Sequence, residues 1–203
     1  MKKIITILIF AISISFYSQV SEIRNLADFN KIEANNGISI EFIQADKNVK
    51  VETDSKQKLK KITTTVENGI LKINAKGNFK LIKVYISNPT LQEVIANNAV
   101  SFTIKNTLKV PDLKLKLNNA VSFMADISVS ELLIEANNAV SMSIFGIAKN
   151  GIFTIKNASS LKAKRLEVDK ANVKVYEAST ATIFAHSIDE KKDLTSTIRN
   201  AKK

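Results

Sequence analysis

Apolar and polar residues alternate with a period of two along most of the chain, and this alternation is interrupted about every twenty residues. The sequence Asn-Asn-Ala-Val-Ser stands at three of these interruptions, beginning at Asn97, Asn118 and Asn137. Degenerate copies occupy Asn35-Asn36-Gly37-Ile38-Ser39, Asn157-Ala158-Ser159-Ser160 and Glu177-Ala178-Ser179-Thr180. Short alternating segments repeated at a nearly fixed step are typical of a chain that winds into a β-solenoid.

The same positions of each copy carry apolar side chains. Three residues after Ala99 and its equivalents come Phe102, Phe123, Met142, Leu161 and Ala181, and three residues before them come Ala96, Leu117, Ala136, Ile155 and Val175. Residues between these positions are mostly polar. We therefore predict two strands per turn with one buried face, and equivalent residues stacked about 4.8 Å apart along the axis.

Asparagine marks the corner between the two strands of a turn. It tolerates the left-handed backbone conformation that a sharp bend requires, and stacked amides can bond to one another in parallel in-register assemblies. Ligand binding by these amides is the alternative. The predicted structural ladder contains Asn98, Asn119, Asn138 and Asn157, and it ends at Glu177.

The first third of the chain is less regular. Val49 to Glu52 and Leu81 to Ile86 have strand patterns, and Asn68-Gly69 between two alternating segments predicts a β-hairpin. The 62 residues from Gly37 to Ala99 are close to three turns, if the phase of the coil is kept. We expect one all-β domain over residues 19–203, with irregular, partly antiparallel strands at 29–90, regular coils of about 20 residues at 91–186, and a cap or tail at 187–203.

The N-terminal segment has the layout of a secretory signal peptide. Lys2-Lys3 precede an apolar run from Ile4 to Phe16, and small residues follow near Ser18. An uncleaved membrane anchor is the alternative, and no later segment is apolar enough to span a bilayer. With a signal peptide at residues 1–18 and no cysteine in the chain, we expect export to the periplasm or cell surface of a Gram-negative bacterium.

The formal net charge of +11 favours anionic partners such as an acidic glycan or an envelope surface. Nucleic acid is not expected, because an exported protein rarely meets it. The densest basic stretch contains Lys149, Lys156, Lys162, Lys164, Arg165, Lys170 and Lys174, and Lys162, Lys164 and Arg165 are its candidate binding residues. A merely solvated basic surface is the alternative.

A second candidate surface is a column of hydroxyls on one outward face, one residue from each turn. A flat, repetitive hydroxyl surface suits carbohydrate or a lattice-matched partner, although Ser and Thr are also common on the solvent face of strands. The column contains Ser101, Ser122, Ser141, Ser160 and Thr180.

Catalytic chemistry is not indicated. The single histidine, His186, has no acidic cluster near it in the sequence, and a surface or capping role is expected. A glycan-cleaving β-helix enzyme needs carboxylates grouped on neighbouring turns, whereas the acids here scatter over different positions of the repeat. We predict no catalytic, cofactor-binding or metal-binding residues.

Three features together resemble the autotransporter adhesin "head GIN" domain family, which is common in Bacteroidetes. They are Gly37-Ile38-Ser39 after the first strand, the segment Val66-Glu67-Asn68-Gly69-Ile70-Leu71-Lys72-Ile73, and the small-residue turns at Ala99, Ala120 and Ala139. The resemblance covers Phe29 to Ala185, with Ser39 in place of the Asn of the family's name. It implies a right-handed, single-stranded parallel β-helix in the cell envelope, and it assigns no binding residues.

The sequence therefore favours an exported, non-catalytic binding or adhesion-type module that presents a repetitive solenoid surface. An envelope structural or assembly protein with a protein partner is the alternative, and a polysaccharide-degrading enzyme is a remote one.

Overall fold

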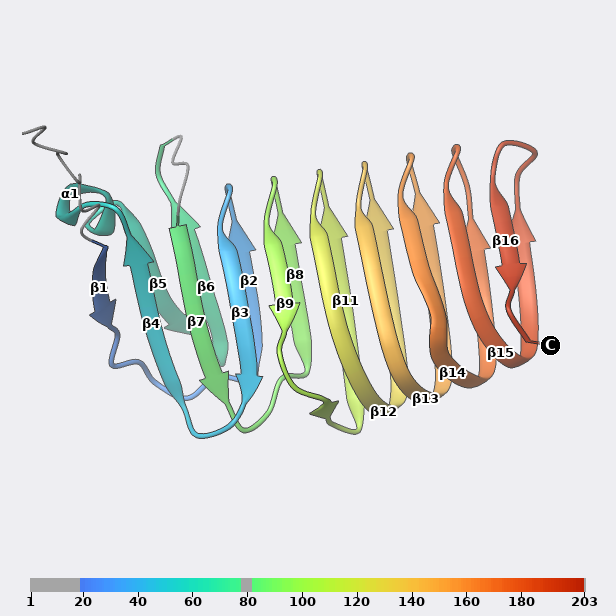
Figure 1. The fold of residues 1–203 in the computed structure, drawn as a ribbon, viewed down its shortest axis with the longest axis horizontal. Helices are drawn as coiled ribbons and strands as arrows, with labels where there is room; N and C mark the ends of the chain where they lie inside the picture. The colour runs from blue at the N-terminus through green and yellow to red at the C-terminus, as the bar shows by residue number, and fades with distance from the viewer. Residues whose placement is uncertain (1–18, 78–81, 203) are drawn as a thin grey trace, which may run out of the picture.

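The structure is a computed structural model that describes residues 19–77 and 82–202. The chain forms a right-handed parallel β-solenoid with a partly antiparallel N-terminal part, as predicted (Figure 1). The predicted signal peptide at 1–18 lies outside the described residues. Windings follow one another along a single axis, so the coil has two flanks and two open ends.

Strands lie on the two flanks, which we name after β9 and β8. The β9 flank begins with β1 (Val20–Ile23), β4 (Asn48–Thr53), β7 (Ile82–Asn88), β3 (Ser39–Gln44) and β9 (Ser101–Ile104), in that spatial order. The β8 flank begins with β5 (Ile62–Glu67), β6 (Ile70–Ala75), β2 (Lys31–Asn35), β8 (Glu93–Asn97) and β11 (Asp112–Asn118).

Later strands are long enough to follow both flanks. They are β12 (Ser122–Asn137), β13 (Ser141–Lys156), β14 (Ser160–Val175) and β15 (Thr180–Lys192), and each bends at the lower edge of Figure 1. The short β10 (Leu108–Lys109) pairs with β12 near this bend. At the C-terminal end β16 (Thr197–Asn200) pairs with β15 on the β9 flank, and at the N-terminal end α1 (Lys56–Leu59) contacts β4.

Equivalent residues stack in register and form one continuous core, as the period of two predicts. The rings of Phe102 and Phe123 are stacked, with centroids 5.6 Å apart and an interplanar angle of 22°. Burial of such a column removes apolar surface from water in every winding, which stabilises each winding through its neighbours. The buried column on the β9 flank contains Ile40, Phe102, Phe123, Met142, Leu161 and Ala181.

The order of the windings in space differs from their order in the sequence. The winding β2–β3 lies between the winding β6–β7 and the winding β8–β9, because β2 pairs in parallel with both β6 and β8. The backbone N–H of Gly37 donates to the carbonyl of Asn98 at 2.9 Å. The prediction of about three turns between Gly37 and Ala99 is therefore wrong, since their windings are direct neighbours.

The residues that follow β3 and precede β8 in the chain build the N-terminal end of the coil. β4 runs antiparallel to β7, and β5 runs antiparallel to β6. The predicted hairpin at Asn68-Gly69 joins β5 to β6, and both turn residues have positive φ (53° and 73°). The antiparallel strands therefore lie at this end of the coil, outside the parallel windings.

Side-chain amides form hydrogen bonds where the chain passes the winding β2–β3 on its way from β7 to β8 and from β9 to β11. Gln44 donates from Nε2 to the carbonyls of Pro89 (2.8 Å) and Lys109 (3.0 Å), and its Oε1 accepts from the Lys109 N–H (2.8 Å). Asn106 and Gln44 also exchange two bonds, each between the side chain of Asn106 and the backbone of Gln44. These bonds satisfy backbone groups that the interrupted strand pairing leaves free.

The corners from Asn36-Gly37 to Glu177-Ala178 each place two consecutive residues in the left-handed region. Gly37 has φ of 66° after Asn36 at 70°, and the later corners repeat this geometry with alanine. An L-residue with a side chain pays roughly 1–2 kcal/mol for such a conformation, so the corners store strain that the stacked windings offset. The alanines are Ala99 (59°), Ala120 (59°), Ala139 (57°), Ala158 (54°) and Ala178 (58°).

At the C-terminal end, side chains take the place of the next corner. Within the coil the corner N–H groups donate to carbonyls of the following winding, as from Ala120 to Asn138 at 2.8 Å. In the last corner Glu177 N–H donates to Asp193 Oδ2 (2.6 Å), and Ala178 N–H donates to Thr195 Oγ1 (3.0 Å). The bond from Glu177, together with hydroxyl donors, lowers the pKa of Asp193 to about 2.

Candidate functional site

The hydroxyl column forms one straight row across the β9 flank. Strand register pairs each of its members with the next, and the hydroxyl of Thr180 donates to that of Ser160 at 3.2 Å. The row also reaches two residues that the predicted column did not include, Ser39 and Thr197. In spatial order it contains Ser39, Ser101, Ser122, Ser141, Ser160, Thr180 and Thr197.

Corner amides lie in a second row. Asn138 donates to Asn119 (2.9 Å), and Asn119 donates to Asn98 (3.1 Å). The row continues beyond the predicted members, because Asn98 donates to Asn36 (3.2 Å) and Asn36 donates to Asn74 (2.7 Å). Every amide donates toward the N-terminal end, so the amide dipoles are aligned along the axis.

Asn157 departs from the predicted ladder. Its amide donates to Asn137 Oδ1 at 2.6 Å, one position nearer the strand, and not to Asn138. Asn137 belongs to an inner row in which Asn118 donates to Asn97 (3.2 Å) and Asn97 donates to Asn35 (3.0 Å). Two parallel amide rows thus share the corner where one was predicted.

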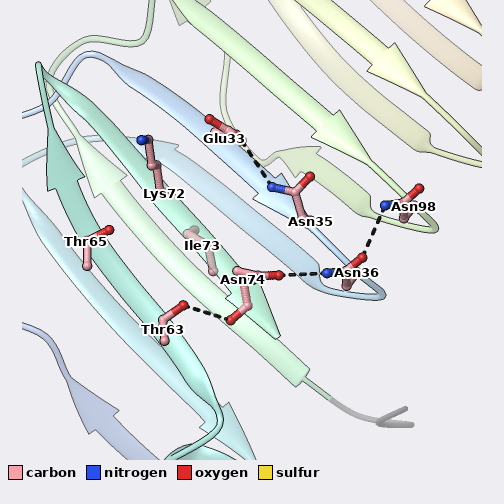
Figure 2. Close-up of a pocket in the computed structure, with 9 residues that line it drawn as sticks. All are labelled: Glu33, Asn35, Asn36, Thr63, Thr65, Lys72, Ile73, Asn74 and Asn98. Carbon is pink, nitrogen blue, oxygen red and sulfur yellow. Dashed lines mark hydrogen bonds between the residues drawn. The ribbon is translucent and has the colours of Figure 1, made fainter. Parts of the chain in front are cut away.

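The outer amide row ends in a polar pocket of about 360 Å³ on the β8 flank (Figure 2). Asn74, Thr63 and Glu33 line it, and Figure 2 shows the bonds from Thr63 to the Asn74 carbonyl and from Asn35 to Glu33. The cation at this pocket is Lys72, whose pKa is raised by its hydrogen bond and ion pair with Glu67. The positive charge of Lys72 is therefore already neutralised by a carboxylate of the same chain.

A basic depression of about 550 Å³ lies at the other end of the molecule, on the β9 flank. It brings together the three predicted cations Lys162, Lys164 and Arg165. Between Ser143/Lys162 and Phe145/Arg165 the register of β13 and β14 shifts, so β14 has one extra residue there. This β-bulge leaves Lys164 and Arg165 both exposed, although they are adjacent in the chain.

Arg199 on β16 is a fourth cation of the depression, and sequence analysis missed it. Lys162 pairs in register with Thr182, and Thr182 pairs with Arg199, so the three form one column. Aligning residues 196–200 with the earlier copies would have revealed it. That alignment was not apparent because the step from Ser179 to Ser196 is only 17 residues.

An aromatic ring holds one of the cations. The Arg165 guanidinium lies over the ring of Phe145, 4.2 Å from its centroid, in a cation–π contact. Phe145 is followed by Gly146, which has φ of 103° and no room for a side chain, since a Cβ would lie 2.0 Å from the carbonyl oxygen of Ile127. The glycine therefore lets β12 and β13 approach closely beside the depression.

The other lysines of the predicted basic stretch do not join the depression. Lys156 and Lys174 lie in the parts of β13 and β14 that follow the β8 flank, and Lys156 contacts the ring of Tyr176. Lys149 and Lys170 lie near the bend. The basic stretch is thus one cluster plus dispersed lysines.

His186 has an acidic neighbour that its sequence context does not reveal. Its Nε2 lies 2.7 Å from Glu167 Oε1 on the adjacent strand, and its ring meets Phe184 edge-on at 5.4 Å. Within residues 19–77 and 82–202, no three His, Asp or Glu side chains form a group that could hold a metal ion. The same residues contain no helix with the length and apolar character of a membrane span.

Solved structures from Bacteroides and Parabacteroides species have a similar fold. The chain superposes with a TM-score of 0.79 on a "putative adhesin" from Bacteroides fragilis, at 17% identity, covering 90% of this chain and 97% of that one. A "putative adhesin" from Parabacteroides distasonis gives 0.64 at 18% identity, with coverage of 90% and 94%. A "putative lipid binding protein" from the same species gives 0.64 at 14% identity, with coverage of 91% and 95%.

At these identities the likeness shows a shared fold. A comparison with curated proteins finds no match. A protein family, however, matches residues 28–198, which is most of the chain and includes the parallel strands from β2 to β15. The chain therefore belongs to the family described as "Putative auto-transporter adhesin, head GIN domain".

Proposed function

We propose that this protein is an exported, non-catalytic binding module of the bacterial cell envelope, of the adhesion type. The observation that supports this most directly is the hydroxyl column on the β9 flank. Its members stand in strand register from Ser39 to Thr197, and most of them are exposed. The β-solenoid spaces them about 4.8 Å apart, which suits an extended, hydroxyl-rich polymer such as a glycan.

A repetitive row suits weak contacts that act together. A single hydrogen bond contributes about 0.5–1.5 kcal/mol net, so one serine gives little affinity. Several equivalent contacts along one ligand raise the affinity without any one deep pocket, because each contact after the first forms within a molecule that is already bound. The residues before and after most members of the column in the chain, such as Val100 and Phe102, are buried, which fixes the position of the column on the surface.

Further support comes from the family, whose description names an adhesin, and from the signal-peptide pattern at residues 1–18. The name of the B. fragilis structure also contains the word adhesin. An adhesion role requires that the β9 flank be accessible at the cell surface. Protease treatment of intact cells tests this, since a surface protein is cleaved and a periplasmic one is protected.

Glycan-array binding of the purified protein tests the ligand class. We expect binding to glycans, weakened at least about tenfold when Ser101, Ser122 and Ser141 are all replaced by alanine, because three hydrogen-bonding groups are lost. The matched control replaces Thr63, Thr65 and Thr154, which are outward hydroxyls of the β8 flank, by alanine. This control protein should keep the wild-type affinity.

Two outcomes would overturn the proposal. Absence of glycan binding together with a stable co-purifying protein would identify an envelope assembly or structural protein. Release of reducing or unsaturated sugar ends from a polysaccharide would identify a glycan-cleaving enzyme.

A further inference from the structure

We infer that the basic depression formed by β13, β14, β15 and β16 binds the anionic groups of an acidic polysaccharide, such as sulfates or uronate carboxylates. This inference rests on the proposed function and adds a ligand class and a location to it. It places the charged part of the ligand at Lys162, Lys164, Arg165 and Arg199.

The four cations lack internal counter-ions. No ion pair within the described residues joins any of them to a carboxylate, whereas lysines elsewhere, such as Lys31 and Lys116 with Glu93, are paired. The nearest carboxylate in register is Asp126, which pairs with Phe145 and lies one winding beyond it. The closest acid in the chain, Glu167, is bonded to His186. Like charges held together repel, and an external anion relieves this repulsion.

Local geometry keeps the cations in one place. The β-bulge of β14 turns both Lys164 and Arg165 outward, and the Phe145 ring supports the Arg165 guanidinium from one side. A guanidinium presents a planar set of donors that matches sulfate and carboxylate oxygens. With the ring holding its orientation, Arg165 loses less conformational freedom when it binds an anion.

Hydroxyls lie beside these charges. Ser143 and Thr182 line the depression, and Thr182 stands between Lys162 and Arg199 in the strand register. The adjacent column residues Ser160, Thr180 and Thr197 lie two positions away on the same strands. A polymer that carries both hydroxyls and anionic groups can therefore contact the hydroxyl column and the depression together. A hollow that combines cations with the hydroxyls of Ser143 and Thr182 favours such a polymer over a flat membrane surface.

Binding to immobilised heparin and polygalacturonate at low salt tests the inference, with neutral dextran as the uncharged probe. We expect binding to both acidic polymers that weakens as salt is raised, since screening shortens the reach of the charges. The double variant K162Q/R199Q should lose at least tenfold in affinity. The matched control K149Q/K174Q removes the same net charge away from the depression and should lose less than twofold. A third variant, Phe145→Leu, removes the ring under Arg165 and should weaken binding severalfold.

Equal losses in the two double variants would overturn the inference, because binding would then follow net charge alone. Stronger binding to phosphatidylglycerol vesicles than to either polymer would also overturn it, in favour of a membrane surface. Circular dichroism checks that every variant is folded. Failure of the underlying function has a different signature, since the serine-to-alanine triple variant would then leave glycan binding unchanged.

Discussion

The side chain of Asn98 donates a hydrogen bond to the side chain of Asn36 at 3.2 Å, although 62 residues separate them in the chain. This bond joins the first winding of the protein to the start of its regular coils. The residues between them continue the coil in the opposite direction, as β4, β5 and the winding β6–β7. Spatial neighbours at this place are therefore not neighbours in the sequence.

Cross-linking tests this arrangement directly, because the natural chain has no cysteine. Ser39 and Ser101 are direct partners in strand register, about 4.8 Å apart. In the double variant Ser39→Cys/Ser101→Cys, a short thiol-reactive cross-linker should join the two positions efficiently. Mass spectrometry of the digested protein would detect the linked peptides.

The control pair for this experiment is Ser39→Cys with Ser160→Cys. These positions lie four windings apart in the same column, roughly 19 Å by the spacing of strands, and the short reagent should not link them. Three intervening turns between residues 39 and 101 would leave both pairs unlinked, contrary to the structure.

Replacing a corner alanine by glycine should stabilise the protein. Ala120 has φ of 59° and is exposed, so Ala120→Gly relieves about 1–2 kcal/mol of left-handed strain. The greater freedom of glycine in the unfolded chain offsets about 0.4–1 kcal/mol of this gain. The net effect should raise Tm by about 2 °C for a chain of this length, measured by thermal denaturation.

The buried Ala136 provides the contrast, since it lies in a strand and fills part of the core. Ala136→Gly should lower Tm, because it adds flexibility and removes core contacts without relieving strain. If both glycine variants lowered Tm alike, the corner alanines would not be strained.

The C-terminal corner should give the fold a dependence on acid. Because the folded pKa of Asp193 is lowered to about 2 from 3.8, its ionised form stabilises the folded state above pH 4. That contribution falls away as the pH drops from about 4 to 2. Asp193→Asn should therefore have a lower Tm than the natural protein at pH 6, and the gap should shrink towards pH 2. A gap that stays constant over this range would contradict the assignment.

Gly146→Ala should destabilise the solenoid. The added methyl group meets the backbone of Ile127 at a φ of 103° that L-residues rarely adopt, and we expect a loss of at least about 2 kcal/mol. Gly37→Ala is the control, since Gly37 has open space around it and alanine occupies the equivalent place in later corners. Chemical denaturation of both variants measures the difference, and equal losses would contradict the close approach of β12 and β13.

The regular coils could be predicted because each winding has apolar residues at the same positions and must bury them in the same way. Phe102, Phe123 and Met142 recur at one position, and a chain with alternate buried residues can superpose them only by stacking its windings. The N-terminal order could not be predicted in this way. A parallel strand such as β6 has the same alternation of apolar and polar residues whether it pairs with one edge of β2 or with the other. The hydrophobic pattern alone therefore does not determine the spatial order of the windings.

The basic depression was predicted in part, for a related reason. Lys162, Lys164 and Arg165 are close in the sequence, and their clustering is visible there. Phe145 and Arg199 join them only through strand register, and that register includes a one-residue bulge and a shortened last step. Irregularities of this kind change which side chains meet while leaving the repeat pattern almost unaltered.

The insertion of the winding β2–β3 also has a consequence for biosynthesis. This winding is made first, yet all four of its strand partners come from residues 70–104, so it has no neighbour while it is the newest part of the chain. Vectorial addition of turns from one end cannot build this region. Residues 31–44 have no strand partner until residues 70–104, which flank them on both sides, have been synthesised. Each later coil, in contrast, can pair with a winding that has already been made.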